Sequence, residues 1–160
     1  MSQQPATTVR QSVVVDAPLD KAFAVFTEEF GRFKPPEHNL LGVEIAETVF
    51  EGRVGGYLYD RGVDGSECRW ARILAYEPPE RVVLSWDIGP TWQIETDPNK
   101  TSEFEVRFIP ETPNRTRVEL EHRNLERHGD GWENVRDGVD GEQGWPLYLH
   151  RYAELFSDET

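Results

Sequence analysis

The sequence predicts an α+β fold in which a curved antiparallel β-sheet of about seven strands wraps around a long C-terminal helix. Six strand-like segments follow one another between residues 43 and 123 without an intervening helix, which indicates an antiparallel meander. A further strand and an amphipathic helix precede them, and an aromatic-rich amphipathic helix follows them. Packing that last helix against one side of a curved sheet leaves a hollow, so we expect an internal cavity.

The first expected elements are a strand and a helix. β-Branched residues over Val9–Val15 favour a strand, and Asp16 and Pro18 are suited to cap the helix and to occupy its first turn. Apolar residues spaced three and four apart over Leu19–Phe30 place a phenylalanine stripe on one helical face. A glycine and two prolines within 31–36 end this helix, so only small helices are expected between the first two strands.

Each of the six later strands is bounded by Gly, Pro, Asn or Asp. Their expected limits are Val43–Phe50, Gly56–Arg61, Glu67–Tyr76, Arg81–Asp87, Thr101–Ile109 and Thr116–Arg123. Residues 88–100 contain too many turn formers for a strand, so we expect an ordered surface loop with Trp92 in its middle. A short helix near Trp132–Asp137 and a longer one over 142–156 or 145–156 complete the chain.

Composition favours one acidic domain. A chain of 160 residues that is 37% hydrophobic can supply one core, so we expect a single domain over 1–160 with an ordered core at about 9–156. The net charge of −13 repels nucleic acid and anionic membranes. The single cysteine, Cys68, excludes an internal disulfide and favours the cytoplasm. No secretion signal or membrane span is expected, and a homodimer is left open.

A series of short motifs extends over nearly the whole chain. They are Asp16-Ala-Pro18, Val54-Gly-Gly56, Asp64-Gly-Ser-Glu-Cys68, Glu77-Pro-Pro-Glu-Arg81, Leu84-Ser-Trp86, Ser102-Glu-Phe-Glu-Val-Arg-Phe108, Arg117-Val-Glu-Leu-Glu-His122 and Gly144-Trp145. In this order and spacing, the chain resembles the START-like, or SRPBCC, superfamily that includes the birch-pollen allergen. Within it, the chain is similar to the bacterial proteins named for homology to the activator of the heat-shock-protein-ninety ATPase.

This resemblance implies a helix-grip fold with an apolar internal cavity. Members of the superfamily bind lipids, hormones and polyketides or occasionally catalyse cyclisation. The name of the narrower group links it to the stress response, but the eukaryotic co-chaperone behind that name has a second part with no counterpart in this chain. A chaperone partner is therefore not the leading expectation.

Aromatic residues are the expected walls of the cavity. Alternation along the strands places Trp86 and Phe104 on the inward face and assigns Trp70 to it as well. The strand over Gly56–Arg61 leaves two choices, because either its two tyrosines or the alternating Leu58 and Asp60 face the hollow. The candidate cavity residues are Tyr57, Tyr59, Trp70, Trp86, Phe104, His122, Trp145 and Tyr148.

His122 is the titratable candidate, because alternation places it on the inward face with Val118 and Leu120. There it can hold the polar end of a ligand or transfer a proton near neutral pH, or it can be a core histidine bonded to a neighbour. An inward Asp60 needs a cationic or donor partner such as Arg72 or His122. These three residues form a candidate polar cluster, with an ordinary salt-bridged sheet edge as the alternative.

The leading functional hypothesis is a binding protein, rather than an enzyme, for a small apolar or aromatic molecule. The histidines, acids and the cysteine lack metal-ligand spacing, and neither a nucleophile elbow nor a phosphate-binding glycine loop occurs, so no metal and no cofactor is expected. One alternative is a cyclase or hydrolase that uses His122 with Asp60 or Arg72. The other is a chaperone-assisting interaction domain that acts through an exposed acidic face of the sheet.

Overall fold

The computed structural model describes residues 7–34 and 38–157. Seven strands of this part of the chain form one antiparallel sheet in the order β1-β7-β6-β5-β4-β3-β2. The strands are β1 Val9–Val15, β2 Ile45–Phe50, β3 Tyr57–Gly62, β4 Glu67–Glu77, β5 Arg81–Trp86, β6 Ser102–Thr112 and β7 Arg115–Arg123. The helices are α1 Leu19–Glu28, α2 Trp132–Asp140 and α3 Trp145–Ser157, with short 3₁₀ turns η1 Phe30–Arg32, η2 Pro98–Lys100 and η3 Leu125–His128.

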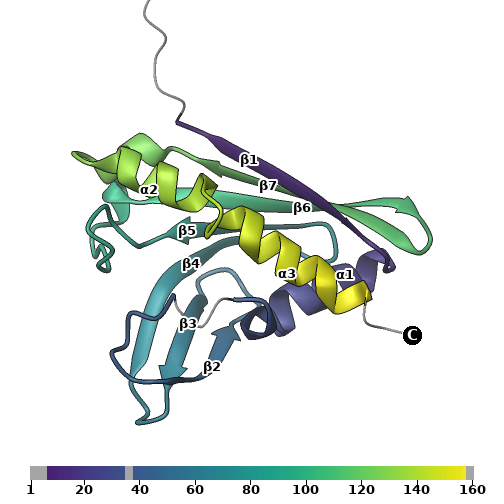
Figure 1. Ribbon diagram of the computed structural model, residues 1–160, viewed down its shortest axis with the longest axis horizontal. Coiled ribbons are helices and arrows are strands. Elements are labelled where there is room, and N and C mark those ends of the chain that lie inside the picture. Colours follow the sequence, from purple (N-terminus) through teal and green to yellow (C-terminus); the bar gives the residue numbers. More distant parts are fainter. Residues whose placement is uncertain (1–6, 35–37, 158–160) are drawn as a thin grey trace, which may run out of the picture.

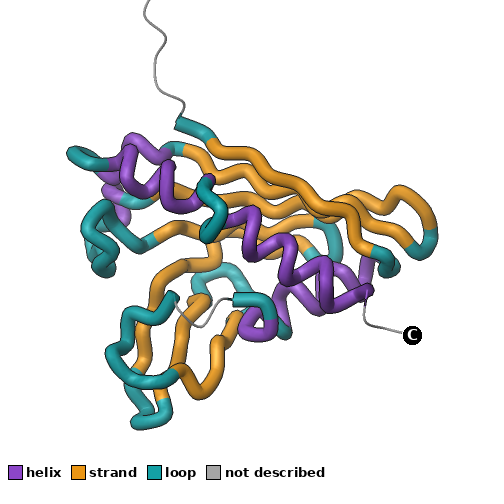
Figure 2. The backbone as a smooth tube through the Cα atoms, in the orientation of Figure 1, coloured by secondary structure: helices purple, strands orange, loops and turns teal. Residues whose placement is uncertain are grey.

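The predicted α+β helix-grip fold is confirmed. Figure 1 shows α3 crossing one side of the curved sheet, with α1 beside its C-terminal end and α2 continuing the same layer toward the opposite end. The tube view in Figure 2 shows that loops join the strands mainly at the two ends of the sheet. Helices and sheet thus enclose one core between two layers, as amphipathic elements require.

Phenylalanines from α1 and η1 anchor the helices to each other and to the sheet. Phe26 packs edge-on against both Phe30 and Tyr152, with ring centroids 5.7 and 5.4 Å apart. The Tyr152 hydroxyl also donates a 2.6 Å hydrogen bond to the carbonyl oxygen of Ala22, which ties α3 to α1. The phenylalanine stripe read from the sequence therefore covers the C-terminal helix as well as the sheet.

The start of α1 differs from the prediction. The N-cap position is Pro18, and it makes no side-chain capping hydrogen bond. Asp16 lies two residues earlier and forms an ion pair with Arg115 at 3.5 Å instead of capping the helix. The predicted change from strand to helix after Val15 is thus confirmed, but the expected capping role of Asp16 was wrong.

Two β-bulges in β4 interrupt the alternation of that strand, whereas β3 alternates regularly between half-buried and buried residues. The pairing of β3 with β4 shifts between Leu58 and Tyr59, and the pairing of β4 with β5 shifts between Ile73 and Ala75. A bulge bends its strand and raises the local twist, which lets the sheet curl. The lower half of the sheet in Figure 1, from β4 to β2, consequently turns away from the plane of β1, β7 and β6.

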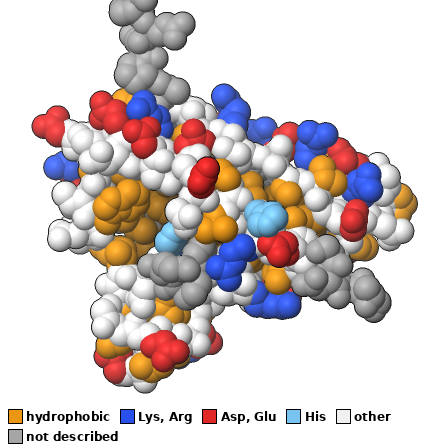
Figure 3. Space-filling model, in the orientation of Figure 1, with side chains coloured by type: hydrophobic (Ala, Val, Ile, Leu, Met, Phe, Trp, Pro, Cys, Tyr) orange, Lys and Arg blue, Asp and Glu red, His pale blue; other side chains and the backbone are white. Residues whose placement is uncertain are grey.

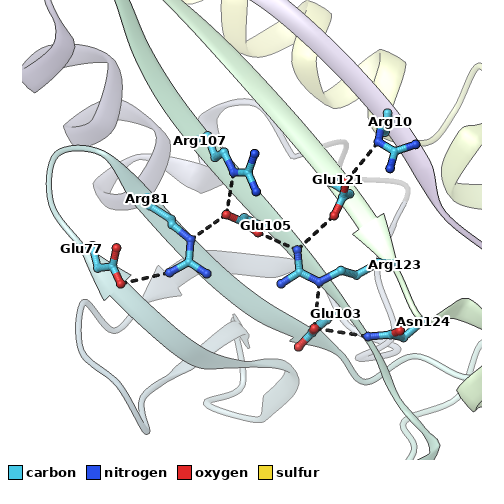
Figure 4. Close-up of polar contacts among 9 residues, drawn as sticks. All are labelled: Arg10, Glu77, Arg81, Glu103, Glu105, Arg107, Glu121, Arg123 and Asn124. Atoms are coloured by element: carbon cyan, nitrogen blue, oxygen red, sulfur yellow. Dashed lines mark hydrogen bonds and ion pairs between the residues drawn. The ribbon is translucent and has the colours of Figure 1, made fainter.

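The outer face of β5, β6 and β7 carries a network of ion pairs (Figure 4) rather than the acidic surface on which the interaction-domain alternative depends. Figure 4 shows Glu105 at its centre, where its carboxylate accepts hydrogen bonds from Arg81 (2.6 Å), Arg107 (2.7 Å) and Arg123 (2.6 Å). Burial alone would raise the pKa of Glu105, but the three guanidinium donors outweigh it and lower that pKa to about 2. Arginine and glutamate therefore compensate each other over this face.

Candidate functional site

The site is a cavity of about 360 Å³ between the sheet and the layer formed by α2 and α3. Its walls come from the segment after η1, from β3, β4 and β5, from the loop over 87–101 and from both helices. In Figure 3, hydrophobic side chains gather below α2 at the left of the view, where this loop borders the cavity. The lining residues are Lys34, His38, Asn39, Leu40, Asp60, Cys68, Trp70, Trp86, Ile88, Trp92, Gly138, Val139, Gln143, Gly144, Trp145 and Tyr148.

A continuous chain of aromatic rings forms the inner wall. Ring centroids are 5.7 Å apart between Trp70 and Trp86, 5.4 Å between Trp86 and Trp145, and 5.3 Å between Trp145 and Tyr148, each in an edge-on arrangement. Large aromatic side chains bury much area with little conformational freedom, so such a wall suits a flat aromatic ligand. The structure places all four of these predicted residues in the cavity wall.

A buried ion pair lies in the same wall. Lys34 and Asp60 are 6% and 2% exposed, and the Lys34 ammonium lies 3.1 Å from Oδ2 of Asp60. The ammonium also donates to the main-chain carbonyl oxygen of His38, while Oδ1 of Asp60 accepts a 2.7 Å hydrogen bond from Thr48. Asp60 therefore has the cationic partner that an inward carboxylate needs, but that partner is Lys34, which the sequence analysis missed.

A second polar pair joins the segment after η1 to α3. Nδ1 of His38 and the hydroxyl of Tyr148 are 2.7 Å apart, and both side chains line the cavity. A histidine and a tyrosine at this distance can exchange a proton. The sequence analysis did not single out His38, because it follows an irregular proline-rich segment without any periodic pattern.

His122 lies behind the aromatic wall rather than in it. It is fully buried, its Nδ1 accepts a 3.0 Å hydrogen bond from the Trp145 indole N–H, and its Nε2 lies 2.7 Å from the Ser102 hydroxyl. Because an indole only donates, the His122 proton must be on Nε2. Ser102 then donates to Nε2 of His128, also 2.7 Å away. Burial, and then the neighbouring His128, lower the pKa of His122 to about 3, so it stays neutral.

The proposed cluster of Asp60, Arg72 and His122 does not form. Arg72 binds both oxygens of Asp87, at 3.2 and 3.3 Å, and donates to the Thr101 hydroxyl at 3.0 Å. Neither Arg72 nor His122 lines the cavity. The choice of ion-pair partners, which is not visible in the sequence, explains this: Asp60 pairs with Lys34, and Arg72 pairs with Asp87.

The other predicted cavity residues lie outside the lining. Leu58 and Asp60 are buried while Tyr57 and Tyr59 are half-buried, so β3 turns its Leu-Asp pair inward. Phe104 is fully buried beneath the wall, with its ring centroid 4.8 Å from that of Trp145. Phe104 therefore supports the wall rather than facing the hollow.

Trp92 closes one side of the mouth. Its backbone has a φ of 60°, which is uncommon for a bulky residue, and its side chain is 44% exposed. The indole packs against Gly138 of α2 so closely that a Cβ there would lie 2.4 Å from it. A glycine inside a helix costs helix stability, and the contact with Trp92 explains the glycine at this position in the last turn of α2.

The remaining polar features of the cavity do not indicate a metal or a cysteine nucleophile. Within residues 7–34 and 38–157, no group of three or more His, Cys, Asp or Glu side chains is placed to hold a metal ion. Burial, and then the negative charge of Asp60, raise the pKa of the Cys68 thiol. Cys68 is therefore protonated near neutral pH, and the thiol is a weak nucleophile.

A helix-grip fold around an aromatic cavity defines a START-like protein, the class that the sequence predicted. The family model described as Activator of Hsp90 ATPase homolog 1-like protein matches residues 16–157, and the chain belongs to that family. None of the curated proteins matches the sequence. Among the helices of the described residues, none combines the length and apolar character needed to cross a membrane.

Solved structures with the same fold include two that exceed a quarter sequence identity. One is the anthrahydroquino-gamma-pyrone synthase Txn09 complexed with SUM, which is 42% identical, with 94% of this chain and 97% of that chain covered and a TM-score of 0.67. The other is the self-sacrificing resistance protein CalC from Micromonospora echinospora, which is 28% identical, with 95% of each chain covered and a TM-score of 0.68. The protein MLL2253 from Mesorhizobium loti, 19% identical with a TM-score of 0.63, over 96% of this chain and 98% of that chain, shares the fold.

Proposed function

We propose that this protein binds a planar polycyclic aromatic molecule of polyketide type in the cavity and closes an oxygen-containing ring on it. The observation that carries this proposal is the 42% identity, over 94% of the chain, to a protein described as an anthrahydroquino-gamma-pyrone synthase. The cavity agrees with such a ligand, since three tryptophans and a tyrosine supply flat apolar surface along one wall.

Closure of a pyrone ring has defined chemical needs. A γ-pyrone fused to an aromatic ring can form when a phenol oxygen attacks a ketone carbonyl of a neighbouring β-diketone side chain and one water is lost. The phenol oxygen must lose its proton, and the departing hydroxyl must gain one. The Lys34–Asp60 pair supplies charge beside the cavity, and the 2.7 Å contact between His38 and Tyr148 supplies a route for a proton.

Capture of the ligand without turnover is the second candidate function. The 28% identity to the resistance protein CalC favours it, as does the burial of His122 behind the wall, which removes the histidine that we first considered as acid or base. Both candidates require an aromatic ligand in the same cavity.

The test uses quinizarin, a dihydroxyanthraquinone dye, as a probe. We expect quinizarin to bind and to quench tryptophan emission, because the wall contains Trp70, Trp86 and Trp145. Trp92→Ala should weaken binding about threefold to tenfold through loss of an aromatic contact. Trp132→Ala is the matched control, since Trp132 does not line the cavity.

Turnover separates the two candidates. An ortho-hydroxyaryl β-diketone incubated with the protein should lose one water, which mass spectrometry detects. Faster water loss than in buffer supports ring closure, and binding without turnover supports capture. A folded protein that does not bind quinizarin would overturn both candidates.

A further inference from the structure

Two tryptophans of the cavity wall, on β4 and β5, have buried indole N–H groups without a hydrogen-bond partner among the described residues. Trp70 and Trp86 are 2% and 6% exposed, and among the described residues neither indole N–H has a hydrogen-bond partner. A buried donor without a partner costs stability, so most are satisfied in native proteins. Two such donors in one cavity wall indicate a place that an oxygen acceptor of a ligand fills after a small adjustment of the rings.

Lys34 adds a positive charge next to this part of the wall. Its ammonium lies 5.9 Å from the centre of the ring of Trp70, one of the two tryptophans whose indole N–H has no partner among the described residues. An ammonium has three N–H donors, and among residues 7–34 and 38–157 the Lys34 ammonium contacts Asp60 and the main-chain oxygen of His38. Both oxygens of Asp60 are engaged, by Lys34 and by Thr48, so the ion pair offers a donor more readily than an acceptor.

We infer that Lys34, Trp70 and Trp86 form an oxygen-binding end of the cavity that selects the phenolate form of an aromatic ligand. This inference rests on the proposed function and specifies which ionisation state and which end of the ligand the site takes. When the ligand ionises there, the phenol O–H bond breaks, the proton leaves to the buffer and the oxygen keeps the electron pair. That oxygen is the nucleophile that ring closure requires.

Other charges do not cancel this preference. Among the residues that the structure describes, the titratable side chains that line the cavity are Lys34, His38, Asp60, Cys68 and Tyr148. The net charge of −13 opposes an anionic ligand, but exposed charges more than about 10 Å away are largely screened by salt, whereas a buried ammonium is not. The negative charge of Asp60 weakens the attraction of Lys34 for an anion. Removal of the Asp60 charge should therefore strengthen the preference for phenolate.

The experiment measures the phenol pKa of bound quinizarin, whose visible absorption changes on ionisation. In wild-type protein we expect bound dye to ionise at lower pH than free dye, with the ionisation constant raised about tenfold, a shift of about one pH unit. Lys34→Met should abolish the shift, Lys34→Arg should retain it, and Asp60→Asn should enlarge it. Lys100→Met, at an exposed lysine outside the cavity, should leave it unchanged.

A double variant is the control in case Lys34→Met does not fold, because that single substitution leaves Asp60 buried without its cation. Lys34→Met with Asp60→Asn removes both charges and should bind the dye with no lowering of its pKa. Dye that binds wild type and this double variant with equal phenol pKa would overturn the inference while leaving the proposed function intact. Wild-type protein that does not bind the dye contradicts the proposed function, and the inference falls with it.

Discussion

The two faces of the sheet differ in whether the buried polar groups compared below have hydrogen-bond partners. On the outer face, Glu105 is 3% exposed, and its carboxylate is held by Arg81, Arg107 and Arg123. On the inner face, Trp70 and Trp86 are similarly buried, but their indole N–H groups have no partner within the described residues. The outer face is complete without a ligand, whereas the inner face leaves hydrogen-bonding capacity beside a cavity. This difference assigns ligand binding to the inner face, while the outer face contributes to stability alone.

The largest expected effect is on the inner face, at Trp145. Trp145 is 2% exposed, packs against Trp86 and Phe104, and donates to His122. Trp145→Ala should lower the free energy of unfolding by about 3 to 5 kcal/mol, as expected for removal of a large buried aromatic side chain. Chemical denaturation measures it, and a loss below about 1 kcal/mol would show that the wall is not part of the core.

The next effect tests the outer face. Glu105→Gln keeps the shape of the side chain but replaces charged hydrogen bonds with neutral ones, so we expect a loss of about 2 kcal/mol in stability at neutral pH. Quinizarin affinity should not change, because Glu105 does not line the cavity. Glu126→Gln, at an exposed glutamate, is the control. A fall in affinity with Glu105→Gln would break the division of roles between the faces.

The pH dependence of stability tests the role of His122. Its pKa falls from an ordinary value of 6.5 to about 3 in the folded protein, so between these values the unfolded chain binds a proton that the folded chain does not. Stability is therefore full above the unfolded pKa and declines as pH falls below it, by about 2 kcal/mol near pH 5. His122→Gln should flatten this slope in urea titrations and leave quinizarin affinity per folded molecule unchanged. An affinity that follows His122 would restore it as a ligand anchor.

The smallest effect concerns the mouth of the cavity. Gly138→Ala adds a Cβ that meets the Trp92 indole at 2.4 Å, so the indole must move away. Because alanine is the better helix former by about 1 kcal/mol, we expect stability to change little or to rise. Dissociation of quinizarin, followed by stopped-flow fluorescence, should become faster. Slower or equal dissociation would mean that Trp92 does not hold the ligand.

The sequence predicted the layers of the fold better than it predicted the polar site. Strand limits depended on local turn formers and β-branched runs, so β1 was predicted over its observed span of Val9–Val15 and the other strands to within a few residues. Alternation placed Trp86 correctly on the inner face because β5 is regular there. The face of β3 stayed undecided, since its tyrosines alternate regularly with Leu58 and Asp60 and both sets combine apolar with polar character.

The polar residues of the site were missed for a different reason. Lys34 and Asp60 come from segments with no common periodicity, and only the folding of the chain after η1 against β3 brings them together. Arg72 was a reasonable partner for Asp60 by charge, but Asp87 offers it a two-point contact at 3.2 and 3.3 Å. Pairing between distant ionic side chains is a tertiary property that a single sequence does not specify.

A crystal structure of the protein with quinizarin tests the central claim most directly, because it shows which face of the sheet takes the ligand. We predict the dye in the cavity, against the wall of Trp86 and Tyr148, with one phenol oxygen within about 3.2 Å of the Lys34 ammonium. Dye bound on the outer face beside Glu105, or a cavity left empty by protein that binds the dye in solution, would contradict the account.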